Sequence, residues 1–346
     1  MTADHLAALC ACIARLREFI YNRCPMPAKP SRSIQIVSHG PSCLDGVMAA
    51  AAVARFYAGH KVTATLAGNN DSDTAIQSLR PKGDGISEVW ITDLSWTSAQ
   101  TGRHLDALAR DGVRVYWIDH HRTAVSRADA PEFKVSFAGK VLTEKYSAAL
   151  LTFNYLKRMA TEGLSAVKRR EFEQFQPFAE IADDHDRWIH KIPQSQDWAL
   201  AVQTLGGAAS YREILRLKEP KMTRRLRIAL EQAHDALRRS CELAHGTVVD
   251  RVLPGGITIR TACCFGYSSE VAAELYAGQQ RMVVALIDLR SQGVSLRRSA
   301  DSEVDLSKLA QAFGGGGHPA ASGFAVPDIH MEPAQRLSEL IAEKMK

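Results

Sequence analysis

Several features that define large classes of proteins are missing from this sequence. The longest apolar run, residues 47–54, is mostly alanine and falls far short of the roughly 20 residues that a membrane-spanning helix needs. No dense block of lysine and arginine is present, although 43 basic residues against 38 acidic ones give a net charge of +5. We therefore expect neither a membrane protein nor an arm that binds duplex nucleic acid. The mild positive charge permits an anionic partner without requiring one.

Cysteine is sparse and shows no pairing pattern. The seven cysteines are Cys10, Cys12, Cys24, Cys43, Cys241, Cys263 and Cys264. An odd number without any Cys-x-x-Cys spacing predicts no disulfide framework, so we expect most of them to be small buried hydrophobic residues. The N-terminal apolar run, residues 6–14, follows Asp4 and precedes Arg15, whereas a secretory signal peptide has its positive charge first. We interpret residues 5–24 as an amphipathic helix of a cytoplasmic protein.

What the chain does contain is typical of a two-domain globular protein. Its 346 residues are 46% hydrophobic, 23% charged and 7% aromatic, which argues against collagen-like, disordered and coiled-coil classes. In the first half, short β-branched runs alternate with helix-length segments. Strands are predicted over 34–38, 62–66, 89–93 and 113–118, and helices over about 46–60 and 97–111. This alternation predicts a doubly wound, mainly parallel α/β sheet.

The second half predicts helices followed by a smaller α/β unit. Helices are expected over 144–160, 165–182 and 210–245, then strands over 257–264, 282–288 and 294–299 with helices over 269–276, 305–312 and 332–345. The chain is accordingly divided into a helical extension (1–33), a first α/β domain (34–200), a helical linker (201–245) and a second α/β domain (246–346).

Acidic and imidazole side chains cluster where predicted elements end. They are His39 and Asp45 after the first strand, Asp93 at the end of the third, Asp119, His120 and His121 after the fourth, and the run Asp183, Asp184, His185, Asp186 after a helix. Ligands of open α/β sheets bind at the carboxyl ends of the strands, so these groups are expected to meet. Carboxylate and imidazole suit Mn²⁺, Mg²⁺, Fe²⁺ or Zn²⁺, and two ions about 3.5–4 Å apart clamp a phosphoryl group. Each group alone is more often a helix cap or a solvated turn; their joint occurrence favours metal.

A glycine-rich segment forms the second group of candidate residues. Gly314, Gly315, Gly316 and Gly317 precede His318, and Phe313 and Phe324 flank the segment. Glycine lets backbone N–H groups approach an anion closely. No Lys-Ser or Lys-Thr pair follows, so the segment is not a P-loop. Glycine repeats alone are typical of flexible hairpins, but the flanking aromatics and the histidine favour a structured loop.

These motifs together resemble the DHH phosphoesterase superfamily. The order Asp45, Asp93, Asp119-His120-His121 resembles its catalytic domain, and the Gly-Gly-Gly-Gly-His-Pro-Ala-Ala-Ser-Gly segment resembles its DHH-associated C-terminal domain. Small two-domain members include nano-RNases, bisphosphate-nucleotide phosphatases and dinucleotide phosphodiesterases, and RecJ-type exonucleases share the core. The resemblance covers roughly residues 34–330 and implies a DHH domain joined by a helical linker to a DHH-associated domain.

The resemblance implies two metal sites that share one carboxylate. His39 and Asp93 would hold one ion, and Asp45, Asp93, His120 and Asp186 would hold the other, with Asp93 bridging. Asp184 is the alternative to Asp186, which is favoured because Asp186-Arg187-Trp188 resembles the family's fourth motif. His121 would face the scissile phosphate, with Asp119 orienting the neighbouring imidazoles.

Further residues are implied as substrate contacts. Gly314 to Gly317 and His318 would grip the nucleotide, and Arg297 or Arg298 would pair with a terminal phosphate. A base also needs a stacking surface. The aromatic candidates are Phe265, Tyr267, Phe313 and Phe324, although aromatic residues near strands more often belong to the core.

Cys43 is a departure from the family pattern. The common first motif is His-x-x-x-Asp-x-Asp, and Cys43 stands where its first Asp would be. One interpretation is that the thiolate ligates the first ion and shifts preference from Mn²⁺ toward Zn²⁺, Fe²⁺ or Co²⁺. The other is that Cys43 only packs and that this metal site is weak or empty.

The resemblance implies a metal-dependent phosphoesterase that uses two divalent ions, with Mn²⁺ the first expectation. Its expected substrates are short single-stranded oligonucleotides or linear and cyclic dinucleotides, cleaved to mononucleotides. The alternatives are a phosphatase that removes the 3′-phosphate of adenosine 3′,5′-bisphosphate and a non-catalytic nucleotide sensor. The glycine-rich loop argues against a polyphosphatase. The sequence is compatible with a homodimer or a monomer, because the helices expected at 5–24 and 210–245 either form an interface or cover the core.

Overall fold

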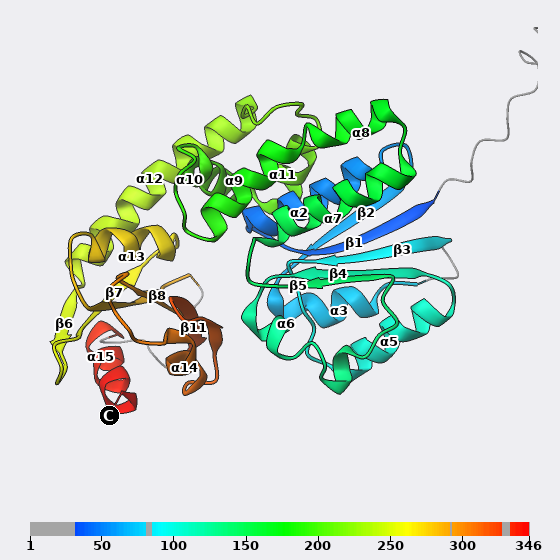
Figure 1. The fold of residues 1–346 in the computed structure, drawn as a ribbon. Coiled ribbons are helices and arrows are strands. Elements are labelled where there is room, and N and C mark those ends of the chain that lie inside the picture. The colour runs from blue at the N-terminus through cyan, green and yellow to red at the C-terminus, as the bar shows by residue number, and fades with distance from the viewer. Residues whose placement is uncertain (1–31, 81–84, 291–292, 327–332, 346) are drawn as a thin grey trace, which may run out of the picture.

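Two α/β units joined by a long helix make up the computed structural model (Figure 1). The structure describes residues 32–80, 85–290, 293–326 and 333–345. The helix predicted within residues 5–24 lies outside this part. Among the described residues, no helix is both long and apolar enough to cross a bilayer.

The first sheet has five parallel strands in the order β2-β1-β3-β4-β5. Their bounds are Ser33–His39 for β1, Lys61–Ala67 for β2, Ile86–Thr92 for β3, Arg114–Asp119 for β4 and Gly139–Leu142 for β5. The first four match the predicted strands, whereas β5 was missed because its four residues carry little hydrophobic pattern. The prediction of a doubly wound parallel sheet is confirmed.

Helices cover both faces of this sheet (Figure 1). One face carries α2 (Leu44–Phe56) with α7 (Ala148–Gly163), and the other carries α3 (Ser72–Gln77) and α5 (Ala99–Arg110). The alanine run of α2 is fully buried, and its small side chains let α2 lie close against both β1 and α7. The short elements η1 (Asn69–Asp71), α6 (Arg122–Ser126) and η2 (Pro131–Phe133) complete the connections.

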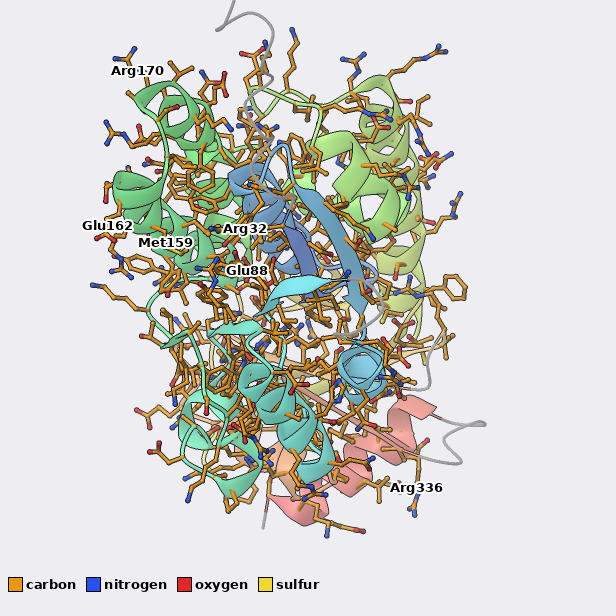
Figure 2. The ribbon with its side chains drawn as sticks, turned by 90° about the vertical axis from the view of Figure 1, so that its right-hand side faces the viewer. Arg32, Glu88, Met159, Glu162, Arg170 and Arg336 are labelled. Atoms are coloured by element: carbon orange, nitrogen blue, oxygen red, sulfur yellow. The ribbon has the colours of Figure 1, made fainter. Side chains whose placement is uncertain are left out.

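The amino ends of the strands bury a carboxylate that is fully paired. Glu88 of β3 has no exposed surface, and its carboxylate accepts hydrogen bonds from Arg32, Arg114 and Tyr57. The Arg32 Nη1 to Glu88 Oε1 distance is 3.3 Å, and Figure 2 labels both residues at this edge. A buried carboxylate with two cations and a hydroxyl around it is a structural group.

The helices that follow the first sheet in sequence depart from the prediction at two places. The helix expected over 165–182 is two helices, α8 (Ala166–Glu173) and α9 (Gln176–Asp186), because Pro177 starts a new helix. The helix expected over 210–245 is α11 (Gly207–Ile214) and α12 (Arg224–Gly246), separated by a segment that contains Pro220. Helix α10 (Ser195–Leu205) packs between α9 and α12.

The second sheet is mixed, in the order β10-β11-β9-β8-β7-β6, and only its β7–β8 pair is parallel. Its strands are β6 (Val249–Val252), β7 (Thr258–Cys264), β8 (Met282–Asp288), β9 (Gly293–Arg298), β10 (Gly316–His318) and β11 (Ala321–Ala325). Helices α13 (Ser268–Tyr276), α14 (Leu306–Gln311) and α15 (Pro333–Lys344) pack on it. This unit is the expected smaller α/β domain.

The glycine-rich segment forms a hairpin at one end of the second sheet. Phe313 and Phe324 stack with ring centroids 4.2 Å apart and close the base of this hairpin. Gly317 has φ +138°, and a Cβ atom there would lie 2.6 Å from the Ser322 Cα atom. The sequence therefore needs glycine at this position so that β10 can lie against β11.

Candidate metal centre

The carboxyl ends of three neighbouring strands, with the start of α2, bring the predicted polar residues together at the edge of the first sheet that faces the second domain (Figure 1). The residues at this edge are His39 at the end of β1, Cys43 and Asp45 at the start of α2, Asp93 after β3, and Asp119, His120 and His121 at the end of β4. Parallel strands place their carboxyl ends at the same edge, so residues separated by more than 80 positions meet there.

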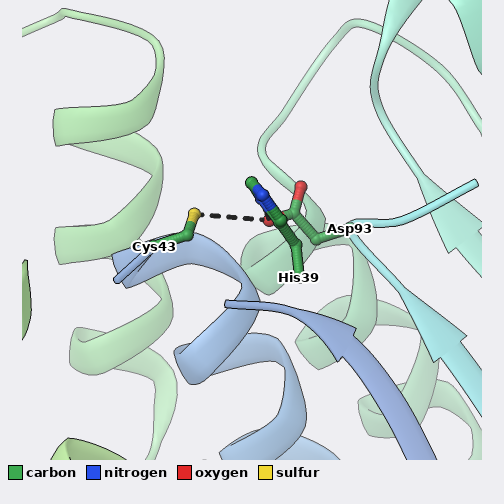
Figure 3. A group of neighbouring side chains, drawn as sticks. All are labelled: His39, Cys43 and Asp93. Carbon is green, nitrogen blue, oxygen red and sulfur yellow. Dashed lines mark hydrogen bonds and ion pairs between the residues drawn. The ribbon is translucent and has the colours of Figure 1, made fainter. Parts of the chain in front are cut away.

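One group of metal-binding atoms comes from His39, Cys43 and Asp93 (Figure 3). The Asp93 Oδ2 atom lies 3.5 Å from His39 Nδ1 and 3.5 Å from Cys43 Sγ. The His39–Asp93 distance is long for a hydrogen bond, but atoms that share a divalent ion lie roughly 3.3–3.6 Å apart. The group therefore has the spacing and the donor types of a metal site, and Cys43 is within it.

A second group surrounds His120. The His120 Nε2 atom lies 3.4 Å from Asp93 Oδ1, 3.6 Å from Asp45 Oδ2 and 3.5 Å from Asp186 Oδ2. Asp93 thus faces the first group with Oδ2 and this group with Oδ1. The bridging role that the resemblance implies for Asp93 stays a prediction, and this placement of its two oxygens is compatible with it.

Two buried polar atoms in the cluster lack a hydrogen-bond partner: Asp93 Oδ1 and His120 Nε2. Leaving such groups unpaired away from water costs about 1–3 kcal/mol each. A divalent cation between them would satisfy both atoms, so the residues present fit the metal that the fold family implies.

The backbone of Asp93 is in the left-handed region, with φ +55°. Its N–H donates to the Ile118 carbonyl at 2.9 Å, which ties the turn to β4. A non-glycine residue in this conformation is strained and persists only where the surroundings enforce it. Here the turn directs the carboxylate between the two groups.

Of the acidic residues at the end of α9, Asp186 alone joins the cluster. The Asp184 carboxylate accepts hydrogen bonds from the Lys191 and Ile192 N–H groups and from Ser195 Oγ, at 2.6–3.1 Å. Asp183 accepts from the Ser147 N–H at 2.6 Å. Asp45 also accepts two backbone N–H groups, so the difference is one of position: Asp186 Oδ2 lies 3.5 Å from His120 Nε2, whereas Asp183 and Asp184 are in none of the groups of metal-binding atoms among the described residues. The geometry therefore favours Asp186 over the alternative Asp184.

Electrostatics in the cluster are dominated by crowded carboxylates. Burial raises the pKa of Asp45 well above its usual range, and the charges of Asp93 and Asp186 raise it further. Burial and the charge of Asp93 also raise the pKa of the Cys43 thiol. Burial lowers the pKa of His120, but the Asp93 carboxylate, 3.4 Å from Nε2, and the charge of Asp186 outweigh this and raise it to about 10. Without bound cations, Asp45, Cys43 and His120 therefore favour their protonated forms.

Asp119 and His121 form a hydrogen-bonded pair at the margin of the cluster, where His121 Nδ1 also lies 3.8 Å from Asp93 Oδ1. The Asp119 Oδ1 atom accepts from the His120 and His121 N–H groups and lies 2.8 Å from His121 Nδ1, while Oδ2 accepts from Ser95 Oγ at 2.7 Å. Burial lowers the pKa of His121, but the charge and hydrogen bond of Asp119 raise it to about 9. Asp119 therefore fixes the orientation of the His121 ring.

The second domain reaches the cluster through the glycine hairpin. The His318 ring stacks on His121 with centroids 5.7 Å apart and lies 5.9 Å from the His120 ring. Burial, followed by the charges of His121 and His120, lowers the pKa of His318 to about 4. His318 is therefore a neutral imidazole over the site. Gly314, Gly315 and Gly316 precede it in the same hairpin.

Arg297 and Arg298, the arginines predicted to pair with a phosphate, form hydrogen bonds within the second domain. Arg298 donates to the carbonyls of Pro319 and Ser302, so its guanidinium supports the hairpin next to His318. Arg297 donates to Ser269 Oγ at 2.7 Å. Among the aromatic candidates, Tyr267 is buried against Thr204 and Phe313 stacks on Phe324, so these belong to the core; Phe265 is exposed.

One feature beside the site escaped the sequence reasoning. A cavity between α6 and α14 beside the hairpin is lined by Arg122, Ser126, Ser307, Lys308 and Gly317, and it adjoins His121 and His318 along the chain. Trp188 of the Asp186-Arg187-Trp188 motif is partly exposed and has φ +56°. The only signal for Arg122 was its place directly after the Asp-His-His motif.

Comparison with known proteins agrees with the fold and with the glycine hairpin. Residues 265–346 match the family model of the DHHA1 domain. Most of the chain is similar in structure to RecJ from Thermus thermophilus in complex with Mn²⁺ (TM-score 0.53, 13% identity, 90% of this chain and 52% of that one). Two others are an exonuclease RecJ bound to manganese (0.52, 15%, 91% and 91%) and the pGpG-specific phosphodiesterase PggH from Vibrio cholerae (0.51, 13%, 91% and 99%).

The chain spans about half of the Thermus RecJ chain, and no curated protein matches it in sequence. Residues 265–346 match the DHHA1 domain, and the chain shares its fold with the RecJ structures and PggH. Both findings agree with the resemblance drawn from its motifs.

Proposed function

We propose that this protein is a metal-dependent phosphoesterase that hydrolyses short oligonucleotides or dinucleotides to mononucleotides. The observation that carries the proposal is the position of Asp93, whose two oxygens face two groups of metal-binding atoms. A shared carboxylate between two such groups is the arrangement used to hold paired divalent ions. The DHH fold and the DHHA1 domain support the same reaction class.

His39, Cys43 and Asp93 would hold one ion, and Asp45, Asp93, His120 and Asp186 would hold the other. Two divalent ions supply charge neutralisation at the phosphoryl oxygens and lower the pKa of a bound water. Mn²⁺ remains the first expectation, and the thiol of Cys43 makes Zn²⁺, Co²⁺ and Fe²⁺ the alternatives.

His121 is the residue best placed to hold a proton for the reaction. Its Nδ1 atom contacts Asp119, which leaves Nε2 to face the substrate. Because Asp119 stabilises the protonated ring, His121 would donate a hydrogen bond or a proton to the leaving oxygen. Neutral His318, stacked on His121, would help to exclude water from the same space.

The size of the substrate follows from the way the second domain covers the site. The glycine hairpin lies over His120 and His121, and β10 contacts α6. A covered site of this kind favours short substrates over long strands. One RecJ relative is named an exonuclease and PggH is named a pGpG-specific phosphodiesterase, which supports a nucleotide phosphodiester as the bond cleaved.

A substrate panel on metal-stripped protein tests the proposal. The protein is refilled in turn with Mn²⁺, Mg²⁺, Co²⁺ and Zn²⁺ and incubated with pGpG, pApA and adenosine 3′,5′-bisphosphate. We expect mononucleotides from the dinucleotides with at least one ion. Phosphate release from the bisphosphate alone would contradict the phosphodiesterase assignment. Nucleotide binding without hydrolysis under every ion would contradict enzymatic function altogether.

A further inference from the structure

A small cavity lies where the two domains meet. Figure 1 shows α6 and α14 on the facing sides of the two domains, and the cavity, with a volume of about 180 Å³, lies between them. Helix α6 directly follows the Asp-His-His motif, and the glycine hairpin contributes Gly317 to the cavity wall. Among the described residues, none that lines the cavity belongs to the groups of metal-binding atoms. The cavity is therefore separate from the metal centre, although its wall continues along the chain into His121 and His318.

Two cations line this cavity, one from each domain. Arg122 is the first residue of α6 and Lys308 lies in α14, and both residues are exposed. Within the part of the chain that the structure describes, neither side chain forms an ion pair with a carboxylate. Two positive charges at the edge of one small space repel each other, whereas an anion between them would attract both.

The cavity wall also holds one carboxylate and several neutral donors. An oxygen of Asp305 accepts hydrogen bonds from the Ser307 N–H at 3.0 Å, from the Lys308 N–H at 3.4 Å and from the Ser307 hydroxyl. This carboxylate is therefore held as the cap of α14, and the wall keeps an excess of one positive charge. The hydroxyl of Thr123 and the amide of Gln311 face the same space and are groups that donate to an oxyanion.

The size of the cavity selects among anions. Pockets that enclose drug-sized ligands measure about 300–1,000 Å³. A volume of about 180 Å³ is smaller, and it suits a phosphate group better than a base with its sugar. Arginine and lysine are also the side chains that bind phosphate most often, arginine through paired N–H donors and lysine as a point charge.

We propose that this cavity binds a phosphate group, free or at the end of a mononucleotide, and thereby fastens the glycine hairpin to the first domain. Arg122 and Lys308 donate to the phosphate oxygens from one domain each. The neighbours of Arg122 and Gln311 in this junction include the stacked rings of His121 and His318, whose centroids lie 5.7 Å apart. A phosphate that bridges the two domains therefore favours the closed arrangement of these rings. Only the mononucleotide as a source rests on the function proposed above, since mononucleotides would be its products.

Calorimetric titration of the full chain tests the site. The protein is stripped of metal so that no ion can hold the phosphate, and it is titrated with inorganic phosphate, with GMP and with guanosine. We expect one inorganic phosphate or one GMP per chain, in competition with each other, and no binding of guanosine. Guanosine that binds as tightly as GMP would overturn the proposal, because the affinity would then reside in the base and the sugar. So would GMP binding without any binding of inorganic phosphate.

Matched variants locate the binding. Arg122→Ala and Lys308→Ala each remove a charged donor, so each should weaken the binding of inorganic phosphate by about tenfold or more. Arg127→Ala, at the end of α6 where the guanidinium lies over the Phe133 ring, and Lys344→Ala in α15 remove the same charges from the same two domains. These controls should change the affinity by no more than about twofold. Equal losses in the cavity variants and the controls would mean that only net charge matters, which contradicts a site.

The fastening of the two domains has a readout of its own. Inorganic phosphate should raise the unfolding temperature of the parent chain more than that of the chain with both Arg122→Ala and Lys308→Ala. An equal rise in the two chains would show that phosphate binds elsewhere. None of these measurements uses hydrolysis, so the phosphate site and the proposed phosphoesterase activity can fail separately.

Discussion

The two ends of the first sheet both bury carboxylates, but they balance the charge in different ways. At the amino ends, Glu88 is enclosed by Arg32, Arg114 and Tyr57. At the carboxyl ends, Asp45 and Asp93 are just as buried, but no arginine or lysine of the described chain pairs with them. Asp45 accepts hydrogen bonds from the Ala148 and Ala149 N–H groups at 2.7 and 2.8 Å, and the side chains beside both carboxylates are histidines, a thiol and a further carboxylate. The first end needs nothing more, whereas the second has unpaired atoms that a cation would satisfy.

The contrast teaches how a structural acid can be separated from a functional one. Burial alone does not distinguish them, since Glu88, Asp45 and Asp93 all have at most 1% of their surface exposed. The distinguishing feature is whether the protein itself supplies the compensating charge. Substitutions at the two ends should therefore affect different quantities.

The largest effect is expected from Asp93→Asn. Asparagine tolerates the left-handed backbone and keeps the shape of the side chain, but it removes the charge that both groups share. We expect kcat to fall by about 10³-fold or more, equivalent to about 4 kcal/mol in activation free energy. Steady-state hydrolysis of pGpG with Mn²⁺ measures this. A variant that keeps most of its turnover, with normal circular dichroism, would refute the bridging role.

Glu88→Gln is the matched substitution at the other end and should show the opposite pattern. It leaves Arg114 without its anion and weakens the hydrogen bond from Tyr57, so we expect a loss of about 2 kcal/mol in the free energy of unfolding. Urea denaturation measures the loss, and kcat of the folded variant should stay within about twofold of the parent. A large fall in kcat without a loss of stability would break the comparison.

Most residues of the cluster at the carboxyl ends could be predicted from the sequence because they lie directly after strands. A buried parallel strand followed by a polar residue is readable from the chain itself, and the sheet then brings such residues together. The selection of Asp186 rested on a family motif. The physical reason is visible only in the fold, where Asp184 is consumed by the turn that contains Lys191 and Ile192.

Other features could not be read from the sequence because they depend on distant partners. Strand β10 is Gly-Gly-His, which has no strand propensity, and it exists because β11 pairs with it. Glu88 looks like any polar residue of an alternating strand until Arg32 and Arg114 are placed beside it. The contact of Glu274 with His245 likewise joins residues on different helices.

Cys43→Asp should sharpen the metal preference of the catalytic end. Aspartate restores the common first motif and replaces a soft donor with a hard one. We expect the ratio of activity with Mn²⁺ to activity with Zn²⁺ or Co²⁺ to rise by about tenfold, or about 1.4 kcal/mol. Activities over a series of ion concentrations measure the ratio. An unchanged ratio would mean that Cys43 only packs, even though its sulfur lies 3.5 Å from Asp93.

The smallest expected effect is the pH dependence of the free energy of unfolding in the absence of metal. The pKa values of His120 and His121 are raised in the fold to about 10 and about 9 from an ordinary 6.5. Their contribution is therefore complete below pH 6.5 and is lost as the pH rises through 9 and 10. The raised pKa values of Cys43, Asp45 and Asp186 act in the same direction, since they too disfavour proton loss in the fold.

Metal reverses this trend because an ion binds the deprotonated forms of the same groups. The urea midpoint of the metal-stripped protein should fall between pH 6.5 and 10, while the gain produced by Mn²⁺ should grow over the same range. Glu88→Gln should leave this pH-dependent gain from Mn²⁺ unchanged, and Asp93→Asn should reduce it. Only Asp93 belongs to the end of the sheet where no arginine or lysine of the described chain balances the carboxylates. Parallel curves with and without Mn²⁺ would show that the carboxyl-end cluster does not take up the ion.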